Sequence, residues 1–294
     1  RPINKADTET LMKTVDLVVA TGSQSNIRSA YSSGTPAVGV GAGNVSVIVD
    51  ETADLNEAAQ KIVASKIFDN ATSCSSENSV VALASVYDDL VAALESQGAK
   101  LLTAGEQEKL QQLMWPDGKL NSGVIARPAR QIAQMAEIDC RAAPDVKVLL
   151  VQESQSGSAY PFSGEKLCPV LTLYRAEDFD GALAQVAEIY AYQGAGHSVG
   201  IHTAHDARAM QIAMELPTCR VIVNQAHCFA TGGSFDNALP FSLSMGCGSW
   251  GGNSISENMN YRHYLNTVRV VRSIPAQEVS PEDLLGDYWA RHGK

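Results

Sequence analysis

Long apolar runs are missing from this 294-residue sequence. It contains no stretch of eighteen or more apolar residues, and its first fifteen residues lack the short apolar core of a secretory signal. Because a membrane-spanning helix needs about 20 apolar residues, neither membrane insertion nor export is indicated. We therefore expect a cytoplasmic protein with no membrane partner.

Paired cysteine motifs and an excess of basic residues are also absent. The six cysteines form no CxxC pair and show no His–Cys spacing typical of zinc, so neither a metal site nor a dense disulfide framework is expected. Twenty-two basic residues against 32 acidic ones give a net charge of −10, which disfavours binding driven by nucleic-acid phosphates. Small molecules are the expected partners.

Short runs rich in valine and isoleucine alternate with longer amphipathic segments along the chain. This alternation predicts an α/β fold whose sheet is covered by helices on its faces. Near-continuous apolar runs suit buried strands. The predicted strands are 16–21, 45–49, 146–151, 169–174, 197–202, 219–224 and 265–272.

Capping residues mark several helix starts. Asp54, Ser85 and Thr103 each stand three positions before an acidic residue, the spacing that satisfies free N–H groups at a helix start. Ser280 repeats this arrangement ahead of a closing helix predicted over residues 281–288.

A candidate phosphate site lies in the segment DLVVATGSQSNIRSAY. Its apolar strand runs into Gly22 and Ser23 and then into a predicted helix, whose first N–H groups could bind a pyrophosphate. The GxGxxG pattern is absent, so an ordinary strand–turn–helix unit explains the segment equally well.

Three residues are candidates for chemistry or ligand binding. Cys74 follows a small polar cluster in FDNATSCSSENS, where a helix start or polar turn would lower the thiol pKa and an apolar core would raise it; a buried structural cysteine is the alternative. His197, in GAGHSVG, suits a proton shuttle or a ligand hydrogen bond, or a purely structural role. Glu165 precedes the apolar run CPVLTLY and either reaches a ribose or ends a solvated strand.

In this order the segments resemble the aldehyde dehydrogenase superfamily, and within it the acylating, CoA-dependent enzymes. The resemblance spans residues 16–272 and is carried by ATGSQSNIRSAYSSGTPAVGVGAGN, ASKIFDNATSCSSEN, FSGEKLCPVLTLYRAEDF, GAGHSVGIHT and GCGSWGGNSISENMNYRHYLNT. It implies an aldehyde dehydrogenase-like fold with a catalytic domain and an incomplete Rossmann-type nucleotide-binding domain. The implied divisions are residues 1–50 for the nucleotide-binding part, 51–240 for the catalytic domain and 241–294 for a return segment, an oligomerisation strand and a C-terminal helix.

The resemblance also implies roles for single residues. Cys74 matches the catalytic nucleophile, and His197 matches the histidine peculiar to the acylating branch. The implied cofactor-binding positions, for NAD or NADP, are Gly22, Ser23, Glu165 and Leu167.

A water-activating base is missing from the matching position. Hydrolytic members carry a glutamate before a Leu-Gly-Gly-Lys segment, whereas Val40 stands there in this sequence, before the residues GAGN. A thioester on Cys74 would then need another acceptor, and coenzyme A is the one that the resemblance implies. The segments NATSCSSEN and SPEDLLGDYWARHG resemble those of enzymes that act on sulfoacetaldehyde, while acetaldehyde, propionaldehyde and succinate semialdehyde stay open as substrates.

The first stretch of the superfamily has no counterpart in this sequence. Half a nucleotide-binding sheet is expected to leave an unpaired strand edge and exposed apolar surface. Two other functions therefore stay open, a truncated non-catalytic assembly fragment and a Cys/His acyl transferase or esterase. The predicted strand at residues 265–272 falls where the superfamily exchanges a strand between subunits, which implies a homo-oligomer, either a dimer or a tetramer.

Overall fold

The computed structural model describes residues 4–141, 143 and 145–294. The chain divides into a large unit that ends at His263 and a C-terminal unit, Tyr264–Lys294. In the part of the chain that is described, no helix combines the length and the apolar character needed to cross a membrane.

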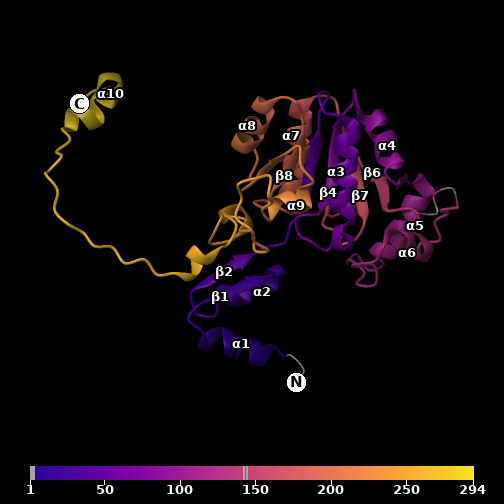
Figure 1. Ribbon diagram of the computed structural model, residues 1–294, viewed down its shortest axis with the longest axis horizontal. Helices are drawn as coiled ribbons and strands as arrows, with labels where there is room; N and C mark the ends of the chain where they lie inside the picture. Colours follow the sequence, from indigo (N-terminus) through magenta and orange to yellow (C-terminus); the bar gives the residue numbers. More distant parts are fainter. Residues whose placement is uncertain (1–3, 142, 144) are drawn as a thin grey trace. The chain divides into compact units, whose positions relative to one another are not determined.

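A parallel sheet of seven strands forms the centre of the large unit (Figure 1). Its strands follow the order β5-β6-β7-β4-β3-β8-β9, and each neighbouring pair is parallel. The strands are β3 (Val45–Val49), β4 (Glu77–Leu83), β5 (Ala99–Leu101), β6 (Val148–Gln152), β7 (Val170–Ala176), β8 (Val199–His202) and β9 (Val221–Val223). The α/β prediction is confirmed.

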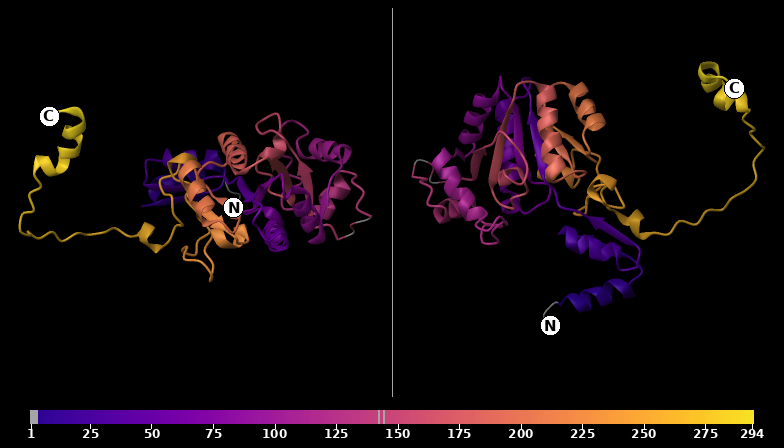
Figure 2. Two further views of the ribbon diagram at one scale, coloured as in Figure 1. Left: turned by 90° about the horizontal axis from the view of Figure 1, so that it is seen from above. Right: turned by 180° about the vertical axis from the view of Figure 1, so that it is seen from behind.

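Helices cover both faces of this sheet, as the two further views show (Figure 2). One face carries α3 (Leu55–Ile67) and α4 (Tyr87–Ser96), and the other carries α7 (Phe179–Tyr192) and α8 (Asp206–Glu215). The remaining helical segments of the sheet region are η1 (Phe68–Ala71), α5 (Ala104–Met114), α6 (Ala129–Met135), η2 (Pro161–Ser163), α9 (His227–Thr231), η3 (Ser249–Gly251) and η4 (Tyr261–Tyr264).

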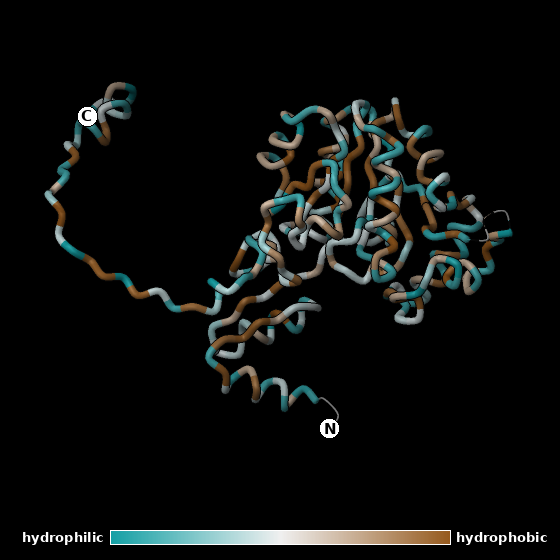
Figure 3. Tube along the Cα trace, in the orientation of Figure 1, coloured by the Kyte–Doolittle hydropathy of each residue, from teal (hydrophilic) through white to brown (hydrophobic). Residues whose placement is uncertain are grey.

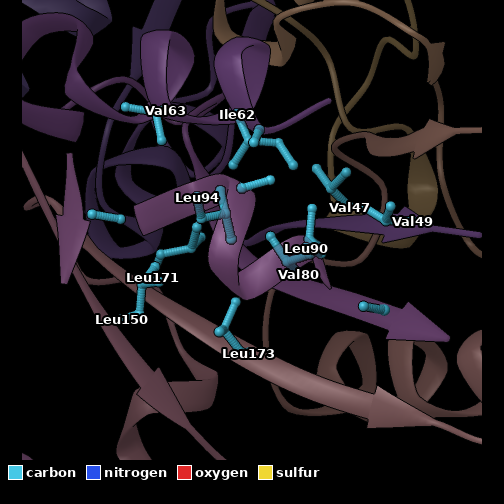
Figure 4. Packing of buried hydrophobic residues seen from close by; sticks show 14 of the residues in the cluster. Val47, Val49, Ile62, Val63, Val80, Leu90, Leu94, Leu150, Leu171 and Leu173 are labelled. Carbon is cyan, nitrogen blue, oxygen red and sulfur yellow. The ribbon is translucent and has the colours of Figure 1, made fainter. Parts of the chain in front are cut away.

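Alternation along the strands divides the core into two layers. Val47 and Val49 of β3 pack with Val80 of β4 against α3 and α4 (Figure 4). Ile48, between Val47 and Val49, and Val81, which follows Val80, point to the opposite face and pack against α7 and α8. Because side chains alternate between the faces of a strand, a strand buried on both sides reads as an unbroken apolar run, which is why Val45–Val49 is recognisable in the sequence.

A second, two-stranded parallel sheet precedes the large one. It pairs β1 (Val18–Thr21) with β2 (Ala37–Val40) and packs against α2 (Gln24–Tyr31), with α1 (Lys5–Thr14) before it. The chain passes from β2 directly into β3 of the large sheet. Val19 of β1 is 38% exposed and Leu11 of α1 is 61% exposed, so apolar surface is left uncovered in this region, as predicted.

Most predicted strands are confirmed: 45–49 has the predicted bounds, and the ends of the others differ by at most two residues. The exception is residues 265–272, where the prediction is wrong because the segment is not a strand. A strand needs a neighbour to pair with, and no strand of the described chain pairs with this one. Three strands were not predicted, β2, β4 and β5.

The predicted caps at Asp54, Thr103 and Ser280 are confirmed. Each side chain accepts a hydrogen bond from the backbone N–H three residues on, and Thr103 and Ser280 complete capping boxes. The prediction for Ser85 is wrong, because α4 begins one residue later with Val86 at its N-cap and no side-chain cap. The closing helix α10 (Pro281–His292) runs four residues beyond its predicted end.

Candidate active site

The candidate residues gather where the parallel strands begin. Parallel strands start at the same side of a sheet, here called the amino edge, and end at the opposite side, the carboxyl edge. Cys74 precedes β4, Glu165 precedes β7 and His197 precedes β8, while Gly43 precedes β3. Segments far apart in sequence therefore meet at the amino edge.

Cys74 sits in a sharply turned segment between η1 and β4. Three successive non-glycine residues before it, Asp69, Asn70 and Ala71, have left-handed backbone conformations with φ of 48°, 49° and 62°. Side-chain-bearing residues adopt this conformation only when the surroundings enforce it, and such residues cluster at functional sites. The turn aims Cys74 at the segment that precedes β8.

The thiol meets an imidazole. Nε2 of His197 lies 3.3 Å from Sγ of Cys74, within hydrogen-bonding range for sulfur. His197 is fully buried, and its carbonyl oxygen accepts a hydrogen bond of 2.9 Å from the guanidinium of Arg220. The backbone of His197 is thereby held in place behind Cys74, which is itself partly exposed.

Gly43 connects Cys74 with Glu165. Its backbone N–H donates to the Glu165 carboxylate, and a Cβ added at Gly43 would lie 1.9 Å from the Cys74 carbonyl oxygen. Any side chain at position 43 would collide with the backbone of Cys74, so this close approach requires glycine.

Burial governs the ionisation of all three candidate side chains. Burial and the charge of Glu165 raise the pKa of Cys74 to about 11, and burial raises the pKa of Glu165 to about 7. Burial and the neighbouring Arg220 lower the pKa of His197 to about 3. At neutral pH the site therefore holds a thiol, a neutral imidazole and a carboxyl group that is poised to titrate.

An apolar cavity of about 470 Å³ adjoins the nucleophile. Ser73 and Ser75, the two neighbours of Cys74 in sequence, line it. The other lining residues are Phe68, Cys228, Phe229, Gly232, Gly233, Phe241, Ser242, Leu243 and Met245. The cavity is large enough for a small organic substrate, and none of the described residues that line it is basic.

Comparisons with known proteins relate this chain to one enzyme family. A model of the aldehyde dehydrogenase family matches residues 7–116. Aligned over its whole length, the chain is 57% identical to the sulfoacetaldehyde dehydrogenase (acylating) of Cupriavidus necator, and the alignment covers 59% of that protein. It is 41% identical to the succinate-semialdehyde dehydrogenase (acetylating) of Clostridium kluyveri. That alignment covers 88% of this chain and 57% of the relative.

A solved structure gives the same result. The acetylating aldehyde dehydrogenase of Geobacillus thermoglucosidasius superposes with a TM-score of 0.87 at 35% identity, over 93% of this chain and 61% of that one. This chain is a relative of the acylating aldehyde dehydrogenases. It spans about 60% of the length of the three relatives named above.

Not all predicted positions of this aldehyde dehydrogenase relative meet at the thiol. Gly22 follows β1 with a φ of 133°, and Ser23 caps α2 by accepting from the N–H of Asn26. The next residue, Gln24, comes within 2.9 Å of a Cβ built on Gly41, so the start of α2 borders the β2–β3 connection. The predicted roles of Gly22 and Ser23 stay predictions.

Leu167 lies in the segment before β7 with a left-handed φ of 50°, and its carbonyl oxygen accepts from the N–H of Ala126. Its predicted role in cofactor binding stays a prediction. No group of three or more potential metal ligands occurs among the described residues.

Sequence reasoning missed the residues behind His197. Ser198 and His227 extend its hydrogen bonds inward, and Arg220 and Asn258 brace the same region from the segments before and after α9. No spacing motif joins these four residues. The signals available in the sequence were Ser198, which follows His197 in GAGHSVG, and the further histidine His227.

Proposed function

We propose that the protein oxidises a short aldehyde to an acyl-CoA, with NAD or NADP as the hydride acceptor and Cys74 as the nucleophile. The observation that carries this proposal is the contact between Cys74 and His197, beside a buried carboxylate and next to an apolar cavity that Ser73 and Ser75 line. A thiol, a proton-handling group and a substrate-sized cavity are what covalent catalysis on an aldehyde requires.

The residues present fit a nicotinamide cofactor. The Glu165 carboxylate is held by Gly43 beside the thiol, which leaves oxygen lone pairs free for ribose hydroxyls. Gly22 has no atom within 4 Å of its added Cβ, so the start of α2 is open for a phosphate. When bound, the nicotinamide supplies the redox chemistry by accepting hydride.

In the proposed reaction, the Cys74 thiolate forms a C–S bond with the carbonyl carbon of the aldehyde. Loss of hydride from that carbon restores the carbonyl group and leaves a thioester on Cys74. The thiolate of coenzyme A then bonds to the same carbon, the bond to Cys74 breaks, and acyl-CoA leaves while the CoA thiol proton passes to solvent. Val40, fully buried at the end of β2, offers no base for attack by water.

Sulfoacetaldehyde is the proposed substrate, and the names of similar proteins support it. Because the lining of the cavity lacks a basic residue among those described, the sulfonate would be held by hydroxyl groups such as those of Ser73, Ser75 and Ser242. Acetaldehyde, propionaldehyde and succinate semialdehyde are the comparison substrates.

We also propose a homo-oligomer in the cytoplasm. The segment 265–272 carries strongly exposed apolar side chains, including Val268 at 89% and Val271 at 88%, which pairing with another subunit would cover. The six cysteines are free thiols, as suits a reducing compartment.

A Cys/His acyl transferase is the second candidate, and the contact between Cys74 and His197 favours it. Such an enzyme would transfer an acyl group without any nicotinamide. Formation of the reduced cofactor therefore distinguishes the two activities.

The test measures reduced nicotinamide and acyl-CoA made by the full-length protein from a panel of short aldehydes, with and without coenzyme A. We expect turnover that requires coenzyme A and is abolished by Cys74→Ser, whereas Cys140→Ser, a partly buried cysteine in another cluster, leaves it intact. Turnover by Cys74→Ser would refute the proposal. Turnover without coenzyme A would indicate a hydrolytic enzyme, and silence throughout would favour a non-catalytic assembly role.

A further inference from the structure

Behind the contact between Cys74 and His197, hydrogen bonds continue into the interior. Nδ1 of His197 lies 2.7 Å from the hydroxyl oxygen of Ser198, and that oxygen lies 2.8 Å from Nε2 of His227. His197 and Ser198 are 0% exposed and His227 is 1% exposed. Cys74 is thus the outer end of a row of four side chains, here called the thiol row, whose inner end is His227 on α9.

Both rings of the thiol row are neutral at physiological pH. Burial and Arg220 lower the pKa of His197 to about 3, and burial with the nearby His197, His202 and Arg220 holds the pKa of His227 well below its usual range. The acidic side chain next to His227 is Glu77, whose carboxylate accepts a hydrogen bond from the backbone N–H of His227. A neutral imidazole carries its proton on one nitrogen only, so each ring nitrogen in the row is either a donor or an acceptor.

The inner end of the thiol row decides its direction. Nδ1 of His227 is buried and has no hydrogen-bond partner among the described residues. This nitrogen faces Gly200 of β8: a Cβ built on Gly200 would lie 3.0 Å from it. The hydrogen of Gly200 that takes the place of this Cβ therefore points at the nitrogen. A proton on Nδ1 would be a buried donor without an acceptor, whereas a bare nitrogen is compatible with the C–H group. The proton of His227 therefore belongs on Nε2.

The rest of the row follows from that choice. Nε2 of His227 donates to Ser198, so the Ser198 hydroxyl donates in turn to Nδ1 of His197. The proton of His197 is then on Nε2, facing the sulfur of Cys74.

We propose that His227 is a positioning residue which, through Ser198, holds the proton of His197 on Nε2, so that His197 meets Cys74 as a hydrogen-bond donor that stabilises the thiolate and not as a base. This inference rests on the proposed function only in the identity of the molecule that the Cys74 thiolate attacks. The proton order itself is independent of any substrate.

The test measures how fast iodoacetamide alkylates Cys74 in the free protein, with peptide mass spectrometry to separate the six cysteines and Cys140 as the internal reference. Ser198→Ala and His227→Phe each remove one link of the row. We expect each to slow alkylation of Cys74 about fivefold near neutral pH, the effect of one lost hydrogen bond, and to move the rise of the rate to higher pH. The rate at Cys140 should not change.

Two controls separate a positioning role from a structural one. Thr231→Val removes a buried hydroxyl from the same helix, one that donates 2.7 Å to the His227 carbonyl oxygen, and should leave the Cys74 rate unchanged. In a His197→Ala background, Ser198→Ala and His227→Phe should have no further effect. An unchanged or faster rate in the single variants overturns the proposal, as does an effect that persists without His197 or that Thr231→Val reproduces.

A second measurement observes the protons directly. Long-range ¹H–¹⁵N correlation spectra of histidine-labelled protein report which ring nitrogen is protonated. We expect the Nε2–H form for both His197 and His227, and an Nδ1–H form at either ring would overturn the proposed direction. If the spectra show both rings protonated on Nε2 but the protein makes no acyl-CoA, the proposed function fails and this inference stands.

Discussion

At the residue scale, two ionisable side chains oppose each other at the amino edge. The charge of Glu165 is one of the causes that raise the pKa of Cys74, second only to burial. Glu165 itself has a pKa raised by burial to about 7, so it is neutral in mildly acidic solution and charged in mildly alkaline solution. Its repulsion of the thiolate therefore exists only above neutral pH.

We expect Glu165→Gln to speed alkylation of Cys74 about threefold at a pH of about 8.5 and to have no effect at a pH of about 6, where Glu165 is already uncharged. Iodoacetamide kinetics at the two pH values measure this. Glu153→Gln, which changes another half-buried carboxyl group, is the matched control and should leave the rate unchanged. Equal acceleration at both pH values would contradict an electrostatic origin.

The sequence predicted part of this site and missed part of it. Cys74, Glu165 and His197 stand in segments whose order resembles a known family, and the structure brings them together. Ser198 and His227 are 29 positions apart, and although Ser198 lies in GAGHSVG, no motif links it to His227, because their partnership depends on the tertiary fold. Hydrogen bonds between distant segments leave no periodic trace in a sequence.

At the scale of elements, the helix caps offer a direct comparison. Thr103 caps α5 in a capping box with Glu106, while the exposed Ser85 caps nothing because α4 starts after Val86. We expect Thr103→Ala to lower the free energy of unfolding by about 1 kcal/mol, whereas Ser85→Ala changes it by less than about 0.5 kcal/mol. Urea unfolding measures both, and equal losses would show that Ser85 also acts as a cap.

The carboxyl edge of the sheet is anchored by one buried ion pair. Asp50, fully buried after β3, accepts hydrogen bonds from Thr52, Thr203 and Arg208, which lower its pKa although burial alone would raise it. We expect Asp50→Asn to lower the free energy of unfolding at neutral pH by about 3 kcal/mol.

The pH dependence of this loss has a definite sign. Because the pKa of Asp50 is depressed by folding, its contribution is complete above the pKa of the unfolded chain and disappears as the pH falls through the folded value. The difference between wild type and Asp50→Asn should therefore shrink in acid. Asp88→Asn, whose carboxylate is 82% exposed beside Arg175, is the control and should cost less than about 1 kcal/mol.

The elements that were missed have physical causes. β4 begins with the polar residues Glu77, Asn78 and Ser79, all buried at the amino edge, so its first half does not look like a strand. β5 has three residues, too few for a periodic signal. The segment 265–272 has a strand-like pattern without a partner strand, and Figure 3 shows hydrophobic and hydrophilic stretches alternating along this tail.

At the scale of the whole molecule, that tail predicts self-association. Val268 and Val270 are 89% and 77% exposed, and in an extended strand they share one face. We expect the protein to form dimers or larger oligomers in solution and Val270→Pro to weaken them, because proline removes a ladder hydrogen bond. Sedimentation velocity over a concentration series measures this, with Val279→Pro as the control outside the pairing segment. A wild-type monomer at all concentrations would contradict the expectation.

The separation of the two edges of the sheet bears on how the protein can evolve. The strands that follow Cys74 and His197, β4 and β8, have seven and four residues, which at about 3.3 Å per residue sets the two edges roughly 13–23 Å apart. Substitutions that far apart usually act independently. Mutations around Asp50 and Arg208 should therefore accumulate and tune heat resistance while the thiol chemistry at the other edge is preserved, and a mutant library confined to the carboxyl edge is the natural place to seek hardier variants.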